Sequence, residues 1–248
     1  MVRGEKHIEE MIAEERKIQR LFRKGCAEYR LLEDGDRILI ALSGGKDSLE
    51  LVRLLAVQQR IYKPRIEVEA AHVLMDNIPY ETDRSYIQRF CEELGVRLHI
   101  LHASFEERSG TRKPRCFLCS WTRRKTLFEF AVENGFNKIA LGHHQDDILV
   151  TLLMNMTFEG SMQTMPPRLE MDHYPVTVIR PLCLVPEHLI KTVAETEGFE
   201  KQKTACPYEQ ATMRQSMTEM FRRLEEMNPE ARYSLWNSMR NIHHDLLP

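Results

Sequence analysis

The sequence predicts an α/β protein in which a parallel, five-stranded sheet is covered by helices on both faces. Two observations lead to this prediction. Short apolar runs alternate along the chain with segments whose apolar residues recur at helical spacing, and a glycine closes several of the helical segments. Such alternation is typical of right-handed βαβ units, in which a helix connects two parallel strands. The 248 residues suffice for one large domain, alone or with a modest appendage.

The expected elements follow one another in a regular order. Strands are predicted at 37–42, 67–75, 96–102, 138–142 and 177–182. Helices are predicted at 49–57, 83–94, about 119–134, about 145–158 and about 186–197. Residues 1–36 are expected to form an N-terminal helical extension, 37–206 the sheet domain, and 207–248 a C-terminal helical segment. The turns after the first and fourth strands would then meet at the carboxyl edge of the sheet, where such folds bind ligands.

Composition is that of an ordinary globular protein, with 42% hydrophobic residues, 29% charged residues and a net charge of −2. No apolar run approaches the roughly 20 residues that cross a bilayer. The first ten residues are too charged for a secretory signal. We therefore expect a cytoplasmic protein without a membrane span.

Two stretches are strongly basic although the whole chain is nearly neutral. Residues 16–30 hold six Lys and Arg against Glu28 alone, and residues 108–125 hold seven with no acid. A stretch of this kind is either a solvated surface or a nucleic-acid site. For 16–30 the sequence leaves both interpretations open.

The segment Ser43–Ser48 lies where the first strand passes into the following helix. Its adjacent glycines let the backbone take positive φ and approach a ligand closely. The helix directs its first N–H groups and its dipole at whatever fills the turn. Two hydroxyls, the charge of Lys46 and the carboxylate of Asp47, a candidate Mg²⁺ ligand, complete the loop. The order of residues is not that of the Walker loop, but it predicts a phosphate site.

Three of the six cysteines are candidate metal ligands. Cys116 and Cys119 form a C-x-x-C pair, which is compatible with a zinc knuckle, a redox pair or an Fe–S ligand pair. The sequence has no second C-x-x-C to complete a zinc knuckle, and a redox pair would sit on the first helix of a small fold. Cys206, followed by a proline, is the candidate third ligand. The other three stand singly in helix or strand contexts and are expected to be buried: Cys26, Cys91 and Cys183.

The phosphate loop resembles the PP-loop of the N-type ATP pyrophosphatases, whose signature is Ser-Gly-Gly-x-Asp-Ser. The segment Gly142–Asp147 is similar to the G-H-x-x-D-D motif of the tRNA-modifying branch. The resemblance extends over roughly residues 37–240 to the tRNA 2-thiocytidine synthetase family. Its remaining motifs here are Cys116-x-x-Cys119, Leu141–Ile148, Met165–Pro167, Ile179–Leu182, Cys206 and Arg214-Gln215. It implies the adenine nucleotide alpha hydrolase-like fold for 37–206, with the C-x-x-C segment inserted.

The resemblance also implies an activity. The enzyme would use ATP and Mg²⁺ to adenylate the C2 carbonyl oxygen of an anticodon-loop cytidine in tRNA, and sulfur would then replace that oxygen to give 2-thiocytidine. A [4Fe-4S] cluster on Cys116, Cys119 and Cys206 would leave one iron without a protein ligand. The sulfur donor would be a cysteine desulfurase or inorganic sulfide. Many family members carry a second cysteine near Cys206, so the third ligand rests on Cys206 being the only nearby candidate.

The resemblance assigns roles to residues of this chain. The expected ATP-binding residues are Ser43, Gly44, Gly45, Lys46, Asp47, Ser48, His72, Gly142 and His143. The expected catalytic residues are Lys46, Asp47, Asp146 and Asp147, with Asp47 as a Mg²⁺ ligand. Adjacent carboxylates at a helix start would also cap that helix, but a nucleotide and metal role is preferred for Asp146 and Asp147. The expected tRNA-binding residues are Arg112, Lys113, Arg115, Arg123 and Arg124.

Two other functions remain open at this point. A lysidine-type ligase or an amidotransferase would share the PP-loop, with cysteines that are incidental or hold zinc. A nucleotide sensor or RNA-binding module would bind the same ligands without catalysis. The oligomeric state is also open. Apolar residues of the N-terminal helix, Ile8, Met11, Ile12 and Ile18, would pack on the chain's own sheet, which is preferred, or on a second subunit of a homodimer.

Overall fold

In the computed structural model, six strands form one sheet in the order β3-β2-β1-β4-β6-β5. The strands are β1 (Arg37–Ala41), β2 (Glu67–Met75), β3 (Arg97–Ala103), β4 (Lys138–Ala140), β5 (Arg168–Glu170) and β6 (Thr177–Ile179). All neighbours are parallel except β5, which runs antiparallel to β6. The α/β class and the five expected strands are confirmed. The sheet has six strands rather than the expected five. The additional strand, β5, was not predicted because its three residues are too few to show a periodic pattern.

The structure describes residues 2–78, 84–105, 115–200 and 213–246, with side chains from residue 12 onward. The chain divides into two units, Met1–His144 with Pro167–Glu209 and Gln145–Pro166 with Gln210–Pro248. The expected domain boundary at residue 206 lies outside the described residues. Residues 145–166 were expected to belong to the sheet domain, but they group with the C-terminal helices.

Each unit has its own set of helices. The first contains α1 (Val2–Glu28), α2 (Lys46–Gln59), α3 (Arg84–Leu94), α4 (Arg115–Glu133) and α6 (Glu187–Thr196). The second contains α5 (Gln145–Met154), the π-helical turn η1 (Asn155–Glu159), α7 (Met213–Met227), α8 (Ala231–Ser238) and the 3-10 turn η2 (His244–Leu246).

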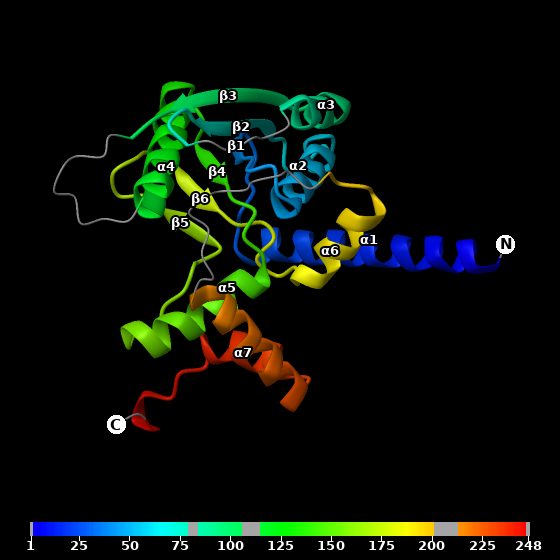
Figure 1. Ribbon diagram of the computed structural model, residues 1–248, viewed down its shortest axis with the longest axis vertical. Helices are drawn as coiled ribbons and strands as arrows, with labels where there is room; N and C mark the ends of the chain where they lie inside the picture. The colour runs from blue at the N-terminus through cyan, green and yellow to red at the C-terminus, as the bar shows by residue number, and fades with distance from the viewer. Residues whose placement is uncertain (1, 79–83, 106–114, 201–212, 247–248) are drawn as a thin grey trace. The chain divides into compact units, whose positions relative to one another are not determined.

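Helices cover the sheet from both sides, with α2 and α3 on one face and α4 on the other (Figure 1). This arrangement follows from the right-handed connections, because the chain crosses back over β1 between β3 and β4. On the α4 face, Leu39, Ala71 and Ile139 of the strands pack against Phe128 and Ala131. The carboxyl ends of β1 and β4 consequently lie side by side.

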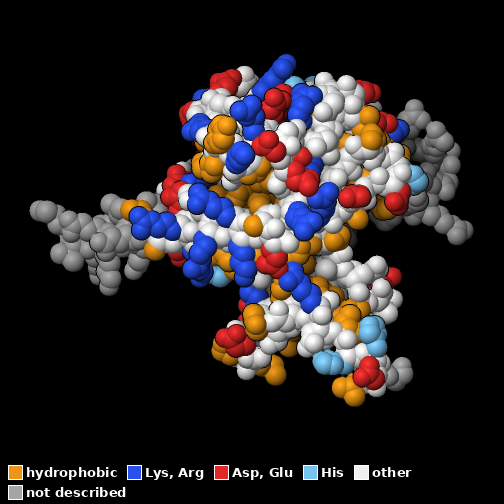
Figure 2. Space-filling view, turned by 180° about the vertical axis from the view of Figure 1, so that it is seen from behind, with side chains coloured by type: hydrophobic (Ala, Val, Ile, Leu, Met, Phe, Trp, Pro, Cys, Tyr) orange, Lys and Arg blue, Asp and Glu red, His pale blue; other side chains and the backbone are white. Residues whose placement is uncertain are grey.

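Helix α1 packs within the chain, against α6. Ile18 is fully buried, and Arg53 of α2 donates to Glu15 at 2.6 Å. Ile12 is exposed, whereas the side chains of Ile8 and Met11 lie outside the described residues. Lys and Arg side chains gather in a band on the surface (Figure 2). The exposed basic residues of α1 are Arg16, Lys17, Arg20, Arg23 and Lys24.

The three single cysteines are buried, as expected. Burial raises the pKa of the Cys91 and Cys183 thiols to about 12 and also raises that of Cys26. They therefore behave as small apolar side chains. In the part of the chain that the structure describes, we find no helix with both the length and the apolar character to span a membrane.

Candidate active site

The phosphate loop closes on itself between β1 and α2. Gly44 takes a φ of +86°, whereas Gly45 has a φ of −80° and caps α2, so only the first glycine uses the left-handed region. Ser43 Oγ lies 3.0 Å from Ser48 Oγ and accepts from the Gly45 N–H at 3.3 Å. Ser48 Oγ also donates to the Gly45 carbonyl at 2.8 Å. These bonds fix the conformation of the turn at the N-terminus of α2, a position that favours an anion.

His72 anchors the start of this loop from the neighbouring strand. Its Nδ1 lies 2.7 Å from the Leu42 carbonyl, and the Leu42 N–H donates to the Ala71 carbonyl at 2.9 Å. Burial lowers the pKa of His72, and the charges of Arg123 and Arg84 lower it further. A neutral His72 that donates through Nδ1 leaves Nε2 as an acceptor. That atom is buried and has no hydrogen-bond partner among the described residues.

Gly142 brings the turn after β4 against the first turn of α2. A Cβ atom at Gly142 would lie 3.1 Å from the Ser48 nitrogen and 3.2 Å from the Asp47 carbonyl group. Real Cβ atoms rarely come so close to backbone, so any larger residue here would push the phosphate loop away. The predicted strand 138–142 ends at Ala140, and this frees Gly142 for the turn.

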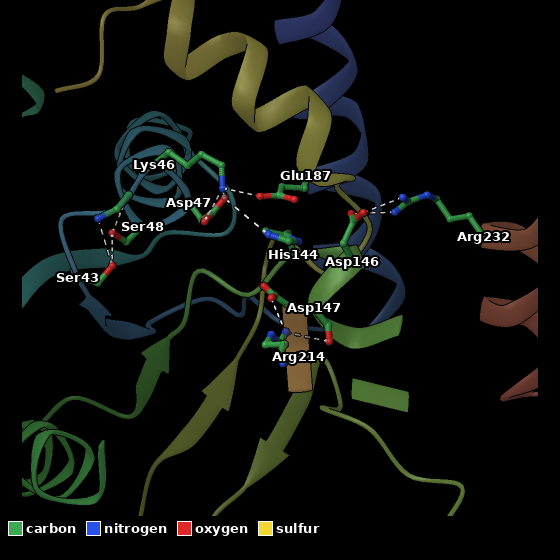
Figure 3. Close-up of polar contacts among 11 residues, drawn as sticks. Ser43, Lys46, Asp47, Ser48, His144, Asp146, Asp147, Glu187, Arg214 and Arg232 are labelled. Atoms are coloured by element: carbon green, nitrogen blue, oxygen red, sulfur yellow. Dashed lines mark hydrogen bonds and ion pairs between the residues drawn. The ribbon is translucent and has the colours of Figure 1, made fainter. Parts of the chain in front are cut away.

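Lys46 lies between two carboxylates (Figure 3). Its Nζ is 3.0 Å from Asp47 Oδ1 and 2.9 Å from Glu187 Oε1, at the start of α6. Burial disfavours the charge of Lys46, but Asp47 and Glu187 together outweigh it and raise the pKa of the ammonium. His144 Nε2 lies 3.8 Å from Asp47 Oδ1. Lys46 is therefore a cation held beside two carboxylates, next to the loop that is expected to bind phosphate.

Asp146 and Asp147, in the second unit, each bind an arginine of a C-terminal helix (Figure 3). Arg232 of α8 makes a two-pronged pair with Asp146, at 2.7 and 2.8 Å. Arg214 of α7 donates to Asp147 Oδ1 at 2.6 Å and to Thr151 Oγ1 at 3.2 Å. Both oxygens of Asp146 thus serve the pair with Arg232.

The C-x-x-C pair lies inside a helix, because α4 begins at Arg115 and not near residue 119 as expected. Cys116 and Cys119 are three residues apart, so their thiols project from neighbouring turns on one side of the helix. Cys119 packs against Met75, Ile78 and Ala103, whereas Cys116 is exposed.

The donor set suits two adjacent ligands of one cluster. No group of three or more potential metal ligands occurs among the described residues. The expected third ligand, Cys206, lies outside them, as do Arg112 and Lys113. Of the remaining expected tRNA-binding residues, Arg115 and Arg124 are exposed and Arg123 is partly buried.

Three residues of these sites were not singled out from the sequence. Glu187 and Arg232 carry no local signal, because each acts on a residue far away in the chain. His144 stands in the expected Gly142–Asp147 segment, and only its distance to Asp47 distinguishes it from His143.

Comparison with known proteins identifies the family. Residues 11–218 match the model of the PP-loop domain. The chain is 35% identical over 230 residues to the tRNA-cytidine(32) 2-sulfurtransferase of Bdellovibrio bacteriovorus, a match that covers 91% of this chain and 88% of the relative. The chain belongs to the PP-loop family, in the branch of the tRNA-cytidine 2-sulfurtransferases.

Further comparisons agree with this placement. The PP-loop protein is 34% identical over 233 residues to the tRNA-cytidine(32) 2-sulfurtransferase of Pseudomonas fluorescens, covering 92% of this chain and 84% of the relative. Among solved structures it is similar to the U34-tRNA thiolase NcsA from Methanococcus maripaludis with its [4Fe-4S] cluster. That match has a TM-score of 0.73 and 26% identity, and covers 94% of this chain and 81% of NcsA.

Proposed function

We propose that this PP-loop protein is an ATP-dependent, iron–sulfur-dependent tRNA sulfurtransferase that converts an anticodon-loop cytidine to 2-thiocytidine. One observation carries the proposal. A phosphate loop with a fixed cation and a carboxylate is built at the end of β1, in a chain similar over most of its length to tRNA-cytidine(32) 2-sulfurtransferases.

The ATP phosphates would lie on the loop Ser43–Ser48. Backbone N–H groups at the start of α2 would donate to them, and the free lone pair of His72 Nε2 would face the nucleotide. Gly142 and His143 would border the loop from the end of β4. Asp47 would hold Mg²⁺ against the phosphates.

Adenylation is the first chemical step. The C2 carbonyl oxygen of the cytidine attacks the α phosphorus of ATP, the bond between that phosphorus and the α,β-bridging oxygen breaks, and the β and γ phosphates leave as pyrophosphate. Lys46 would offset the charge that develops on this leaving group. Because Asp47 and Glu187 keep Lys46 protonated, the cation is present before ATP arrives. Sulfur then replaces the adenylated oxygen, which departs as part of AMP.

Cys116 and Cys119 would bind two irons of a [4Fe-4S] cluster, and Cys206 a third, which leaves one iron without a protein ligand. When bound, the cluster would present sulfur as the nucleophile for the second step. A cysteine desulfurase or inorganic sulfide would supply that sulfur. Arg115, Arg123 and Arg124 would contact the tRNA backbone on the same helix, with Arg112 and Lys113 before it.

The test uses protein purified without oxygen and tRNA from cells that lack the gene. The wild type is expected to release pyrophosphate only when tRNA is present, and mass spectrometry of the nucleosides should then show 2-thiocytidine. Asp47→Asn should lower pyrophosphate release by about 10²- to 10³-fold while tRNA affinity stays unchanged. Asp172→Asn, the same charge change on an exposed residue, is the control. A lysine-containing or aminated nucleoside, or no modified nucleoside at all, would overturn the proposal.

A further inference from the structure

One side of α4 is covered by the sheet at its C-terminal half and reaches the surface at its N-terminal half. Phe117, Trp121, Arg124, Phe128 and Ala131 follow one another at alternating spacings of four and three, so they line a single stripe. Phe128 and Ala131 are 3% and 0% exposed, whereas Phe117 and Trp121 are 48% and 54% exposed. The stripe therefore ends in two aromatic rings at the surface.

Positive charge flanks these rings. Nζ of Lys125 lies 5.6 Å from the centre of the Trp121 ring, within the range of a cation–π contact. Lys125 also lies 3.6 Å from Glu129, an exposed pair that contributes little. Between Arg115 and Lys125 the helix contains no acid.

Arg180, which follows the sheet strand β6, adds to the positive charge around Arg124. Burial lowers the pKa of the Arg180 guanidinium, and the nearby charge of Arg124 lowers it further. Arg180 follows directly after β6 and is buried, while Arg124 is exposed.

Exposed aromatic rings among cations suit single-stranded nucleic acid, whose bases stack on the rings while its phosphates meet Lys and Arg. Duplex RNA offers no free base face. The centre of a protein interface is depleted of charged residues, which this surface is not. We propose that Phe117 and Trp121, flanked by Arg124 and Lys125, form a stacking platform for an unpaired base of an RNA loop.

This inference rests on the proposed function and deepens it. Trp121 stands two residues after Cys119, so a base held on the platform belongs to the part of the RNA that reaches the proposed sulfur site. The platform would distinguish an RNA loop from a stem, because only a loop offers an unpaired base. Contacts of Arg and Lys with phosphates alone would not make this distinction.

Tryptophan fluorescence tests the platform directly, because the chain has only two tryptophans. Trp121 is exposed, whereas Trp236 is 9% exposed. The variant Trp236→Phe leaves Trp121 as the only indole emitter. A hairpin RNA with an anticodon stem and loop is expected to quench its emission and to shield it from acrylamide. A fully paired duplex of the same stem sequence is expected to do neither.

Affinity supplies the second readout. Trp121→Ala should weaken hairpin binding by about 5- to 100-fold, the usual loss for one base–aromatic stack, and Trp121→Phe should retain most of it. Tyr62→Ala is the matched control, because it removes another highly exposed aromatic ring from the same unit. It should leave the affinity for the hairpin unchanged. The salt dependence should be unaltered in Trp121→Ala, whereas Arg124→Ala should lower its slope by about one. Iron content equal to that of the wild type shows that Trp121→Ala keeps the cluster.

The outcomes separate the two proposals. If the wild type binds the hairpin while Trp121→Ala binds equally well and Trp121 emission is not quenched, the platform is wrong and the proposed function stands. If Trp121 is shielded by a sulfur-donor protein and not by the hairpin, the surface docks protein and the inference is also wrong. If the wild type neither binds nor thiolates tRNA, the proposed function fails and the platform with it.

Discussion

Gly142 shows how one missing Cβ atom shapes the phosphate site. The residue lies against backbone atoms of Ser48 and Asp47, which cannot move without shifting the start of α2. Backbone N–H groups at that helix start are the expected phosphate donors. The position therefore requires glycine for close approach and not for a positive φ.

We expect Gly142→Ala to impair nucleotide binding more than folding. The added methyl group displaces the first turn of α2, and such misplacement should weaken ATP affinity by roughly tenfold or more. Overpacking should also cost about 1–3 kcal/mol of stability. Isothermal titration with ATP and urea unfolding measure the two effects.

Gly95→Ala provides the comparison for this variant. Gly95 has a φ of +71° and a Cβ there would meet nothing within 4 Å. The substitution should cost about 1–2 kcal/mol of stability through backbone strain without changing ATP affinity. Equal ATP affinity in Gly142→Ala and the wild type would show that the loop tolerates the contact.

At the scale of helices, Arg232 joins three elements of the second unit. Its guanidinium pairs with Asp146 of α5, donates to Glu225 of α7 at 2.9 Å and lies 5.0 Å from the centre of the Phe221 ring. Asp146 and Glu225 raise the pKa of Arg232 against the opposing effect of burial. A planar guanidinium can make all these contacts at once, and a lysine ammonium cannot.

We expect Arg232→Lys to loosen the packing of α8 on α5 and α7. The variant keeps the charge but loses the two-pronged pair, which should cost about 1–3 kcal/mol. Amide hydrogen exchange of α8 should become faster, while exchange in β1 and β2 stays as in the wild type. Arg223→Lys makes the same change on α7, where Arg223 is exposed and 3.5 Å from Glu219. It should alter stability by less than about 0.5 kcal/mol, and an equal effect of both variants would contradict the expectation.

At the scale of the whole molecule, the cysteines divide into two sets. Cys26, Cys91 and Cys183 are buried in the first unit, whereas Cys116 and Cys119 lie near the surface at the start of α4. Cys206 stands far along the chain from this pair, so a cluster on all three would link two distant segments. Loss of the proposed cluster should therefore reduce sulfur transfer, and ATP binding at the proposed site Ser43–Ser48 should be unchanged.

We expect protein purified without oxygen to contain about four iron and four sulfide per chain. Cys116→Ser, Cys119→Ser and Cys206→Ser should each lose most of the iron and all thiolation, because a serine hydroxyl is a poor cluster ligand. ATP affinity should stay as in the wild type. Cys91→Ala, which alters a buried apolar cysteine, should keep its iron. Colourless, zinc-loaded protein with full thiolation activity would disprove the cluster.

Much of this protein was determined by its sequence alone, because the signals are local. Apolar periodicity defined the five parallel strands and most helices, and the neighbouring residues of Ser43–Ser48 predicted a phosphate site. Burial of the single cysteines followed from their apolar surroundings. The start of α4 was placed too late, since the basic residues before Cys119 carry no helical signal.

Only the tertiary structure decided which distant residues meet. The pairing of Lys46 with Glu187, the approach of Gly142 to Ser48 and the pairing of Arg232 with Asp146 join segments far apart in the chain. The tertiary structure also decided which half of the α4 stripe is exposed. Trp121 and Phe128 lie on the same side of the helix, but the sheet covers only Phe128. Local patterns specify which face of an element is apolar, and the packing of the other elements determines how much of that face is buried.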